Sequence, residues 1–217
     1  MKLISVSVGQ PQIVPTHNES FVTTSIFKSP VDGRVKVNPL NLAGDRQADL
    51  RVHGGRNKAV YVYPSEHYEF WKGEFPEIEF EHGYFGENLT TEGLLETEVF
   101  IGDKLRIGTA EFGVTEPRMP CYKLGVRFGG SDIIKRFLKS RRSGFYLTVL
   151  NTGEIETGDT ISVYSRDANH VSVADIVRLY VQDKDDTETM NRALMVDMLP
   201  DSWKEGFREQ LRQGRLF

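Results

Sequence analysis

Short runs that alternate apolar and polar residues dominate the first 165 residues of the chain. They are rich in β-branched and aromatic residues, and Gly, Asn or Asp separates most of them. The runs cover residues 3–9, 23–28, 59–64, 98–102, 104–108, 110–116, 144–150 and 159–164. Turn signals at Gly102-Asp103 and Gly108-Thr109 predict a tight meander. So many short strands favour a mainly β barrel or sandwich over a parallel sheet with crossover helices.

Two stretches within this region have a helical pattern instead. They are "PSEHYEFWKGEF", residues 64–75, and "SDIIKRFLKS", residues 131–140. The second begins with Ser131, a residue that often caps a helix N-terminus. We therefore expect helices that flank the sheet in an α+β arrangement.

After residue 165 the periodicity becomes helical throughout. Three apolar stripes follow one another at helix spacing. They comprise Val173, Ile176, Val177, Tyr180 and Val181, then Met190, Ala193, Leu194 and Met198, then Trp203, Phe207 and Leu211. Ser172 and Asp175 form a capping-box pattern, and Pro200 ends the second stripe. The sequence thus predicts a β domain over 1–165 and a three-helix domain over 166–217, too small to be stable unless it packs on the β domain or on a second copy in a homodimer.

Composition narrows the class of protein. The chain has 217 residues, of which 39% are hydrophobic and 27% charged, as in an ordinary soluble protein. No apolar run is long enough to span a membrane, and the first residues alternate like a strand rather than a signal peptide. The single cysteine, Cys121, cannot form an intrachain disulfide. We therefore expect a cytoplasmic protein in a thiol-reducing compartment.

Charge is distributed unevenly along the chain. The net charge of -4 argues against nucleic acid as a partner. Residues 66–98 contain ten acidic residues and one lysine, whereas residues 117–142 contain eight Lys or Arg and one Asp. Solvated faces are the ordinary interpretation of such a pattern. The alternative is that the basic segment, which contains Cys121, forms a site for an anion.

The segment "PRMPCYKL" holds Cys121 between two cations, Arg118 and Lys123, and between two prolines. Neighbouring cations favour the thiolate, which acts as a nucleophile or as a ligand for a soft metal. Proline restricts the backbone and suits a preorganised site. A buried cysteine that only fills space is the alternative.

Two other segments carry candidate binding residues. "GDRQADLRVHGGRNK", from Gly44 to Lys58, combines glycines with cations and His53, a composition suited to phosphate but also typical of a surface loop. In "YFGENLTTEGL", the amide of Asn88 could recognise a heterocycle, or could bond to the backbone in a turn.

Several common sites do not fit. The histidines and the cysteine show no zinc-ligand spacing, and one cysteine cannot hold an iron–sulfur cluster. A thiol hydrolase using Cys121 with His53 or His67 stays open, although no family-specific signature surrounds the cysteine.

Together, "GDRQADLRVHGG", "YPSEHYEFW", "FGENLTTEGL" and "EPRMPCYKL" resemble the MOSC domain, the C-terminal domain of molybdenum cofactor sulfurase. The order and spacing are most similar to its YiiM-like branch, which also ends in a small three-helix domain. The resemblance covers nearly the whole chain and implies a MOSC-type β-barrel.

The resemblance also implies a cofactor and an activity. The cofactor is the molybdenum cofactor, in which a pterin (molybdopterin) bears a dithiolene and a phosphate, and Cys121 would ligate the molybdenum. Lys58, Arg118 and Lys123 would lie near the phosphate or oxo groups, and Asn88 and His53 near the pterin or metal edge. The implied enzyme is an oxidoreductase that reduces N-hydroxylated bases such as 6-hydroxylaminopurine with electrons from an external donor protein. A non-catalytic carrier of the cofactor or of sulfur is the alternative.

Overall fold

The computed structural model describes residues 1–16, 20–49 and 54–213. Its main sheet has eight strands in the order β12-β8-β9-β10-β6-β7-β1-β4, and two further two-stranded sheets pair β2 with β3 and β5 with β11. The strands are β1 (Lys2–Val8), β2 (Gln12–Pro15), β3 (Phe21–Thr24), β4 (Ser29–Pro30), β5 (Val35–Val37), β6 (Val60–Pro64), β7 (Leu89–Glu92), β8 (Lys104–Ile107), β9 (Ala110–Pro117), β10 (Phe145–Asn151), β11 (Gly153–Ile155) and β12 (Ile161–Ser165). All pairs are antiparallel except β6 with β7.

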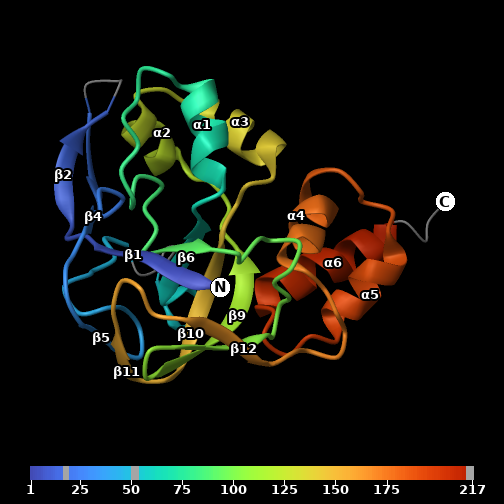
Figure 1. Cartoon of the computed structure of the whole chain (residues 1–217). Coiled ribbons are helices and arrows are strands. Elements are labelled where there is room, and N and C mark those ends of the chain that lie inside the picture. Colours follow the sequence, from blue (N-terminus) through green and yellow to red (C-terminus); the bar gives the residue numbers. More distant parts are fainter. Residues whose placement is uncertain (17–19, 50–53, 214–217) are drawn as a thin grey trace.

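The helices gather in two groups (Figure 1). They are α1 (His67–Glu74), α2 (Tyr122–Phe128), α3 (Asp132–Ser140), α4 (Val173–Val181), α5 (Thr187–Leu194) and α6 (Asp201–Gln213), with a short 3-10 helix η1 (Arg56–Lys58) before β6. The first three lie together at one end of the sheet and the last three form a cluster at its side. A mixed fold, rich in β structure and flanked by helices, is therefore confirmed.

Closure of the sheet into a barrel stays a prediction. The order of the main sheet ends at β12 and β4. An isolated bridge joins Lys2 to Thr160, and the Leu3 amide donates to the Asp159 carbonyl at 2.9 Å. These contacts bring the beginning of β1 to the beginning of β12 without adding a ladder between them.

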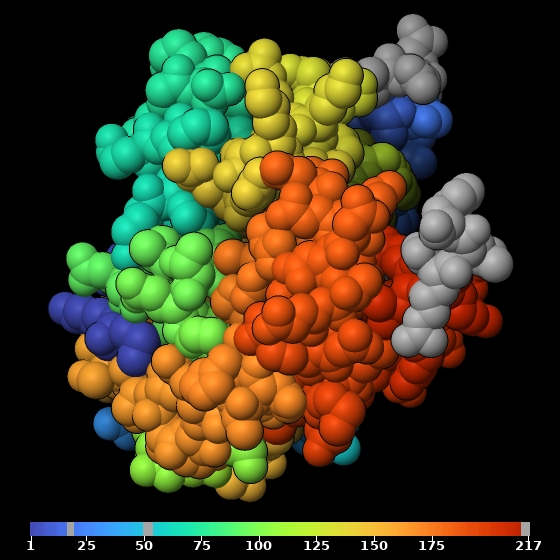
Figure 2. Space-filling model, turned by 90° about the vertical axis from the view of Figure 1, so that its right-hand side faces the viewer, coloured from blue at the N-terminus to red at the C-terminus, as the bar shows by residue number. Residues whose placement is uncertain are grey.

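The three C-terminal helices share one apolar core with the sheet. Side chains that are at most 2% exposed come from β8, β9 and β10 and from all three helices; they include Leu105, Phe112, Leu147, Ile176, Leu179, Met190, Ala193 and Phe207. Figure 2 shows the helices, orange to red, against the green and yellow segments that precede them. A Cβ atom on Gly113 of β9 would meet the Met198 sulfur at 2.6 Å, so glycine permits the close approach there. The boundary at 165/166 thus divides the sequence but not the core, and as a domain boundary it stays a prediction.

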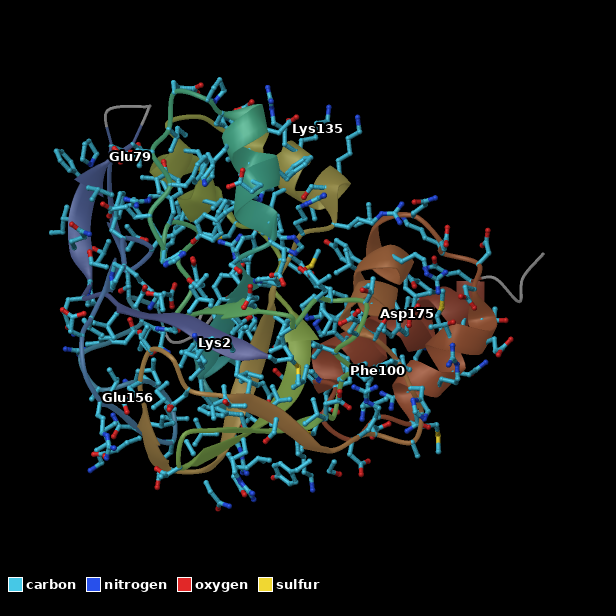
Figure 3. The ribbon with its side chains drawn as sticks, viewed as in Figure 1. Lys2, Glu79, Phe100, Lys135, Glu156 and Asp175 are labelled. Atoms are coloured by element: carbon cyan, nitrogen blue, oxygen red, sulfur yellow. The ribbon has the colours of Figure 1, made fainter. Side chains whose placement is uncertain are left out.

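The helix signals after residue 165 are confirmed in detail. Ser172 and Asp175 form the expected capping box: the Asp175 amide donates to Ser172 Oγ and the Ser172 amide to Asp175 Oδ2, each at 3.0 Å. A strand-like bridge joins Phe100 to Ser172 just before this helix, and Figure 3 labels Phe100 and Asp175 on the two sides of that junction. The stripe predicted for α4 ends early, because Tyr180 is 51% exposed.

Two strand predictions are wrong, and one capping prediction is confirmed only in position. Residues 98–102 form turns around an isolated bridge rather than a strand: Val99 and Ile101 are buried, but Gly102 has a φ of 91°, which turns the chain. Residues 25–28 leave the β3 strand and form a wall of a cavity. Ser131 occupies the predicted N-cap position of α3, but its backbone is helical and its side chain makes no capping hydrogen bond. The apolar residues at 98–102 are buried although the segment is irregular. Alternating apolar residues there therefore do not indicate a strand.

Candidate functional site

A cavity opens where the β9–α2 connection meets the segment after β3. It encloses about 650 Å³ of space between its lining atoms, with the open solvent at its mouth included. Its lining residues come from six separate parts of the chain and comprise Thr24, Ser25, Ile26, Lys28, Asp45, Gln47, Ala48, Lys58, Tyr61, Phe85, Gly86, Asn88, Arg118, Met119, Cys121, Lys123 and Tyr146. Five of the six predicted site residues are among them. The sixth, His53, lies outside the described residues.

Cys121 is half-buried at the start of α2. Its backbone is extended, with φ −122° and ψ 170°, and its carbonyl accepts the Leu124 amide at 2.9 Å. Pro117 ends β9 opposite Phe145 of β10, so the strand pair fixes the point from which the cysteine segment leaves the sheet. The thiol thus belongs to the cavity wall, not to either apolar core.

Arg118 is buried, with 5% of its surface exposed, and its guanidinium lies over two aromatic rings. The guanidinium carbon is 5.1 Å from the centre of the Phe137 ring and 5.5 Å from that of Tyr61. Its Nη1 atom is buried and has no hydrogen-bond partner among the described residues. A buried donor without a partner costs free energy, so this atom points to a ligand that accepts its hydrogen bond.

The electrostatics of this wall keep the guanidinium charged. Burial by itself lowers the pKa of Arg118, but the phenols of Tyr61 and Tyr146 and the thiol of Cys121 together raise that pKa above its usual value. Burial likewise raises the pKa of Tyr146 to about 12, against the opposing effect of Arg118. Tyr146 therefore carries its hydroxyl proton at neutral pH, next to the cysteine and the arginine.

Tyr146 was not predicted as a site residue. In the sequence it is one aromatic position of the β10 run and carries no local signal. It enters the cavity because β10 pairs with β9, which places Tyr146 opposite Glu116 and so beside the cysteine segment. Only the strand register brings it there.

Asn88 lines the cavity, but its amide is used by the fold. Its Oδ1 accepts the Tyr61 amide at 3.1 Å, and its Nδ2 donates to the Ser7 carbonyl at 3.2 Å. The side chain therefore links β1 to β6 across the end of β7. Of the two alternatives, bonding to the backbone is the one found, although with distant strands rather than within a turn.

Lys58 forms an ion pair with Glu116 of β9, and Glu116 also accepts a hydrogen bond from the C-terminal helix α6. Its Nζ is 3.9 Å from Glu116 Oε2, and the same oxygen accepts the indole N–H of Trp203 on α6 at 2.9 Å. Burial raises the pKa of Glu116, while Lys58 and Trp203 partly offset the shift. The buried carboxylate of Glu116 thus connects Trp203 of the C-terminal helices to Lys58 of the cavity lining.

A second wall offers hydrogen-bond acceptors. Lys28 forms a buried ion pair with Asp45 Oδ1, which also accepts the Gly9 amide at 2.8 Å. Asp45 Oδ2 and Ser25 Oγ are buried and have no partner among the described residues. Asp45 belongs to the glycine-rich segment, where sequence reasoning weighed only the cations and the histidine.

The donor set fits an anionic cofactor with a polar ring system. Arg118, Lys58 and Lys123 supply positive charge around the thiol of Cys121, and Arg118 Nη1 needs an acceptor. The Asp45 wall offers acceptors to N–H groups, such as those of a pterin. Among the described residues, no group of three or more His, Cys, Asp or Glu side chains is placed to hold a metal ion.

Two family models match the chain. The model described as MOSC domain matches residues 49–162, and the model described as YiiM-like, 3-alpha helix domain matches residues 171–214. Together they include the C-terminal helices and the part of the cavity lining from Lys58 onward, but not the lining residues that precede residue 49.

Two related proteins match nearly the full length of this chain, and a third matches part of it. The chain is 36% identical over 208 residues to the uncharacterized protein YflK of Bacillus subtilis, with 96% of this chain and 93% of that protein covered. It is 34% identical over 215 residues to protein YiiM of Escherichia coli, with 98% and 94% covered. A Gibberella moniliformis protein named "Reductase" is 37% identical over 161 residues, which are 73% of this chain but 28% of that protein.

Two solved structures of YiiM proteins have the same overall fold as this chain. The crystal structure of YiiM from Geobacillus stearothermophilus has a TM-score of 0.80 at 33% identity, with 97% of this chain and 98% of that chain covered. YiiM from Escherichia coli has a TM-score of 0.78 at 29% identity, with 99% and 94% covered. Among the described residues, no helix has the length and apolar character needed to cross a bilayer.

Proposed function

Because the chain belongs to the MOSC domain family and carries a YiiM-like three-helix domain, we propose that it binds the molybdenum cofactor in the Cys121 cavity. We further propose that it is a reductase of N-hydroxylated bases such as 6-hydroxylaminopurine. The reaction would take place in the cytoplasm, with electrons from an external donor protein.

The unpartnered Nη1 of buried Arg118, in the same cavity as Cys121, carries this proposal. Burying an arginine that is only 5% exposed, with no hydrogen-bond partner on one nitrogen, costs free energy of folding. A bound anion would accept that hydrogen bond and offset the cost. Lys123, at 8% exposure, adds a second buried cation to the same wall. The soft sulfur of Cys121 in the same cavity would suit molybdenum better than it suits a hard metal ion.

The cofactor, when bound, would supply a two-electron centre for removing oxygen from an N–OH group. The overall change is R–NH–OH + 2 e⁻ + 2 H⁺ → R–NH₂ + H₂O, so two electrons and two protons must reach the site. Tyr146 holds a proton on its hydroxyl beside Cys121 and Arg118, since its pKa is raised to about 12. That hydroxyl can donate a hydrogen bond to the departing oxygen without losing its proton.

The positive wall would orient the cofactor as well as bind it. Arg118 is fixed by its backbone bond to Gly144 and by the rings beneath it, and Lys58 is fixed by Glu116. Charges held in place by the fold need little reorganisation when a ligand arrives. The relative named "Reductase" supports an oxidoreductase activity, although this chain spans only 28% of that protein.

The test is Cys121→Ser, prepared in a host that makes the molybdenum cofactor. Serine has a far higher pKa than cysteine and offers little anionic ligand at neutral pH. We expect pterin to be retained in part, because other side chains contact it. We also expect the metal's spectroscopic signature to change and 6-hydroxylaminopurine reduction with a chemical reductant to be lost.

Molybdenum, pterin and turnover are measured on the same preparation. Full reductase activity in Cys121→Ser would overturn the assignment of Cys121 as ligand. Wild-type protein that loads the cofactor but reduces no N-hydroxylated base would be a carrier instead. If Cys121 acts as a nucleophile instead, Cys121→Ser would leave the metal content unchanged and abolish a covalent intermediate.

A further inference from the structure

A second hollow shares one lining residue, Met119, with the thiol cavity. It encloses about 580 Å³ of empty space with its mouth included, and it is lined by Met119, Tyr180, Ser202, Trp203, Gly206, Phe207 and Gln210. Apart from Met119, every lining residue comes from α4 or α6. Because Met119 lines both spaces, they meet at this residue. We call the second hollow the α6 groove.

The α6 groove differs from the thiol cavity in charge. None of its lining residues carries a formal charge, whereas the thiol cavity contains Lys58, Arg118 and Lys123. Three aromatic side chains form its walls: the Tyr180 and Trp203 rings are 5.6 Å apart, and those of Trp203 and Phe207 are 6.0 Å apart. Aromatic walls without charge favour a flat, neutral occupant that stacks.

The orientation of Trp203 is set by a carboxylate that also pairs with a lining residue of the thiol cavity. Its indole N–H donates to Glu116, the carboxylate that pairs with Lys58. The nitrogen is therefore already used, so Trp203 can contact an occupant of the groove only through the carbon atoms of its ring. The same contact ties the position of the groove to the position of the cavity.

Gln210 adds a polar atom to the apolar groove. Its Oε1 is buried and has no hydrogen-bond partner among the described residues. Either orientation of an amide would place a hydrogen-bonding atom there. An occupant that stacks on aromatic rings and offers both N–H donors and ring acceptors satisfies this atom, whereas a hydrocarbon does not.

We propose that the α6 groove is the subsite for the neutral heteroaromatic ring of the substrate, with its N–OH group directed past Met119 toward Cys121. The inference rests on the proposed function for the identity of the substrate. It assigns substrate selection to the three-helix domain, as opposed to the domain that holds the cofactor.

Gly206 allows the groove to be filled without disturbing the fold. It lies within α6, and a Cβ atom built on it meets nothing within 4 Å. Replacing a helical glycine also raises helix propensity. Gly206→Leu should therefore fold normally and place a side chain in the groove. Gly73→Leu is the matched control, because Gly73 lies within α1 with equally open space around it and lines neither hollow.

The experiment measures binding of adenine, a neutral purine and the product expected from 6-hydroxylaminopurine, to the full-length protein. Calorimetry gives the affinity, and the emission of Trp203, recorded in a Trp71→Phe background, reports contact with the groove. We expect Gly206→Leu to weaken adenine binding at least about tenfold and Gly73→Leu to leave it unchanged. Gln210→Leu should weaken it by a smaller factor, while cofactor content stays at the wild-type level in all three variants.

Equal adenine affinity in wild type and Gly206→Leu, or no binding to wild type at millimolar concentration, would overturn the subsite. The proposed function fails by a different result, namely cofactor-loaded wild type that binds adenine but reduces no 6-hydroxylaminopurine. If the subsite and the proposed reductase function are both correct, Gly206→Leu should raise the KM for 6-hydroxylaminopurine about tenfold and change kcat little. The reason is that the groove binds the ring and not the reacting group.

Discussion

At the scale of single residues, the site depends on atoms that the fold buries without satisfying. Arg118 Nη1, Asp45 Oδ2 and Ser25 Oγ all line one cavity, and none has a partner among the described residues. By contrast Glu87, which is fully buried, accepts hydrogen bonds from Tyr68, Gly83, Phe85 and Thr90 and serves structure alone. The acidic segment is therefore not only a solvated face.

Reversal of the charge at Lys123 should expel the cofactor. Lys123→Glu places a carboxylate on the buried cationic wall, so lost attraction and new repulsion together should cost about 2–5 kcal/mol of binding free energy. The measurement is the pterin retained per protein after dialysis. Lys135→Glu is the matched control, because Lys135 makes the same charge change on the exposed face of α3 (Figure 3). Equal pterin loss in both variants would mean that overall charge, not the cavity, decides binding.

At the scale of elements, local signals succeed where a contact lies within a few residues. The capping box at Ser172 is the predicted case. The structure adds a second local cap, which the sequence analysis did not name, in Asp186 at the start of α5: its Oδ1 accepts the Thr189 amide at 3.0 Å, and its Oδ2 accepts from Arg178 at 2.8 Å. These hydrogen bonds, first with Thr189 and then with Arg178, lower the pKa of Asp186 to about 2.

Asp186→Ala should lower the free energy of unfolding by about 1 kcal/mol at pH 7 through loss of the cap. Since the pKa of Asp186 is depressed in the folded state, its contribution is complete above the unfolded value of about 4 and is lost as the pH falls through about 2. The difference between variant and wild type should shrink over that window in urea titrations. Asp185→Ala, one residue earlier and exposed, should have little effect. A difference that does not change with pH would contradict the role of the carboxylate.

At the scale of the whole molecule, the C-terminal helices and the sheet should unfold together. Ile176, Met190 and Phe207 belong to the same apolar cluster as Phe112 and Leu147 of the sheet, so separation would expose that cluster. The helices are thus expected to gain their stability from this shared core, as a segment of this size rarely folds alone.

One cooperative transition is therefore expected in guanidinium chloride. Trp71 lies in the aromatic cluster under α1 to α3, and Trp203 lies on α6, so the two indoles report on opposite parts of the molecule. Single-tryptophan variants followed by fluorescence should give the same midpoint as circular dichroism of each variant. An earlier midpoint for Trp203 would show that the C-terminal helices unfold separately.

From the sequence alone we could predict the three-helix pattern after residue 165, the β-rich character before it and five cavity residues, Lys58, Asn88, Arg118, Cys121 and Lys123. Each followed from periodicity, local composition or motif, which operate over a few neighbouring positions. It could not assign Tyr146, Asp45 or the bond from Trp203 to Glu116, whose partners lie 87 residues apart. It also could not decide between the two uses of Asn88, because Tyr61 and Ser7 reach that amide only through strand pairing. The tertiary structure decided these points, since burial and hydrogen-bond satisfaction depend on which distant segments meet.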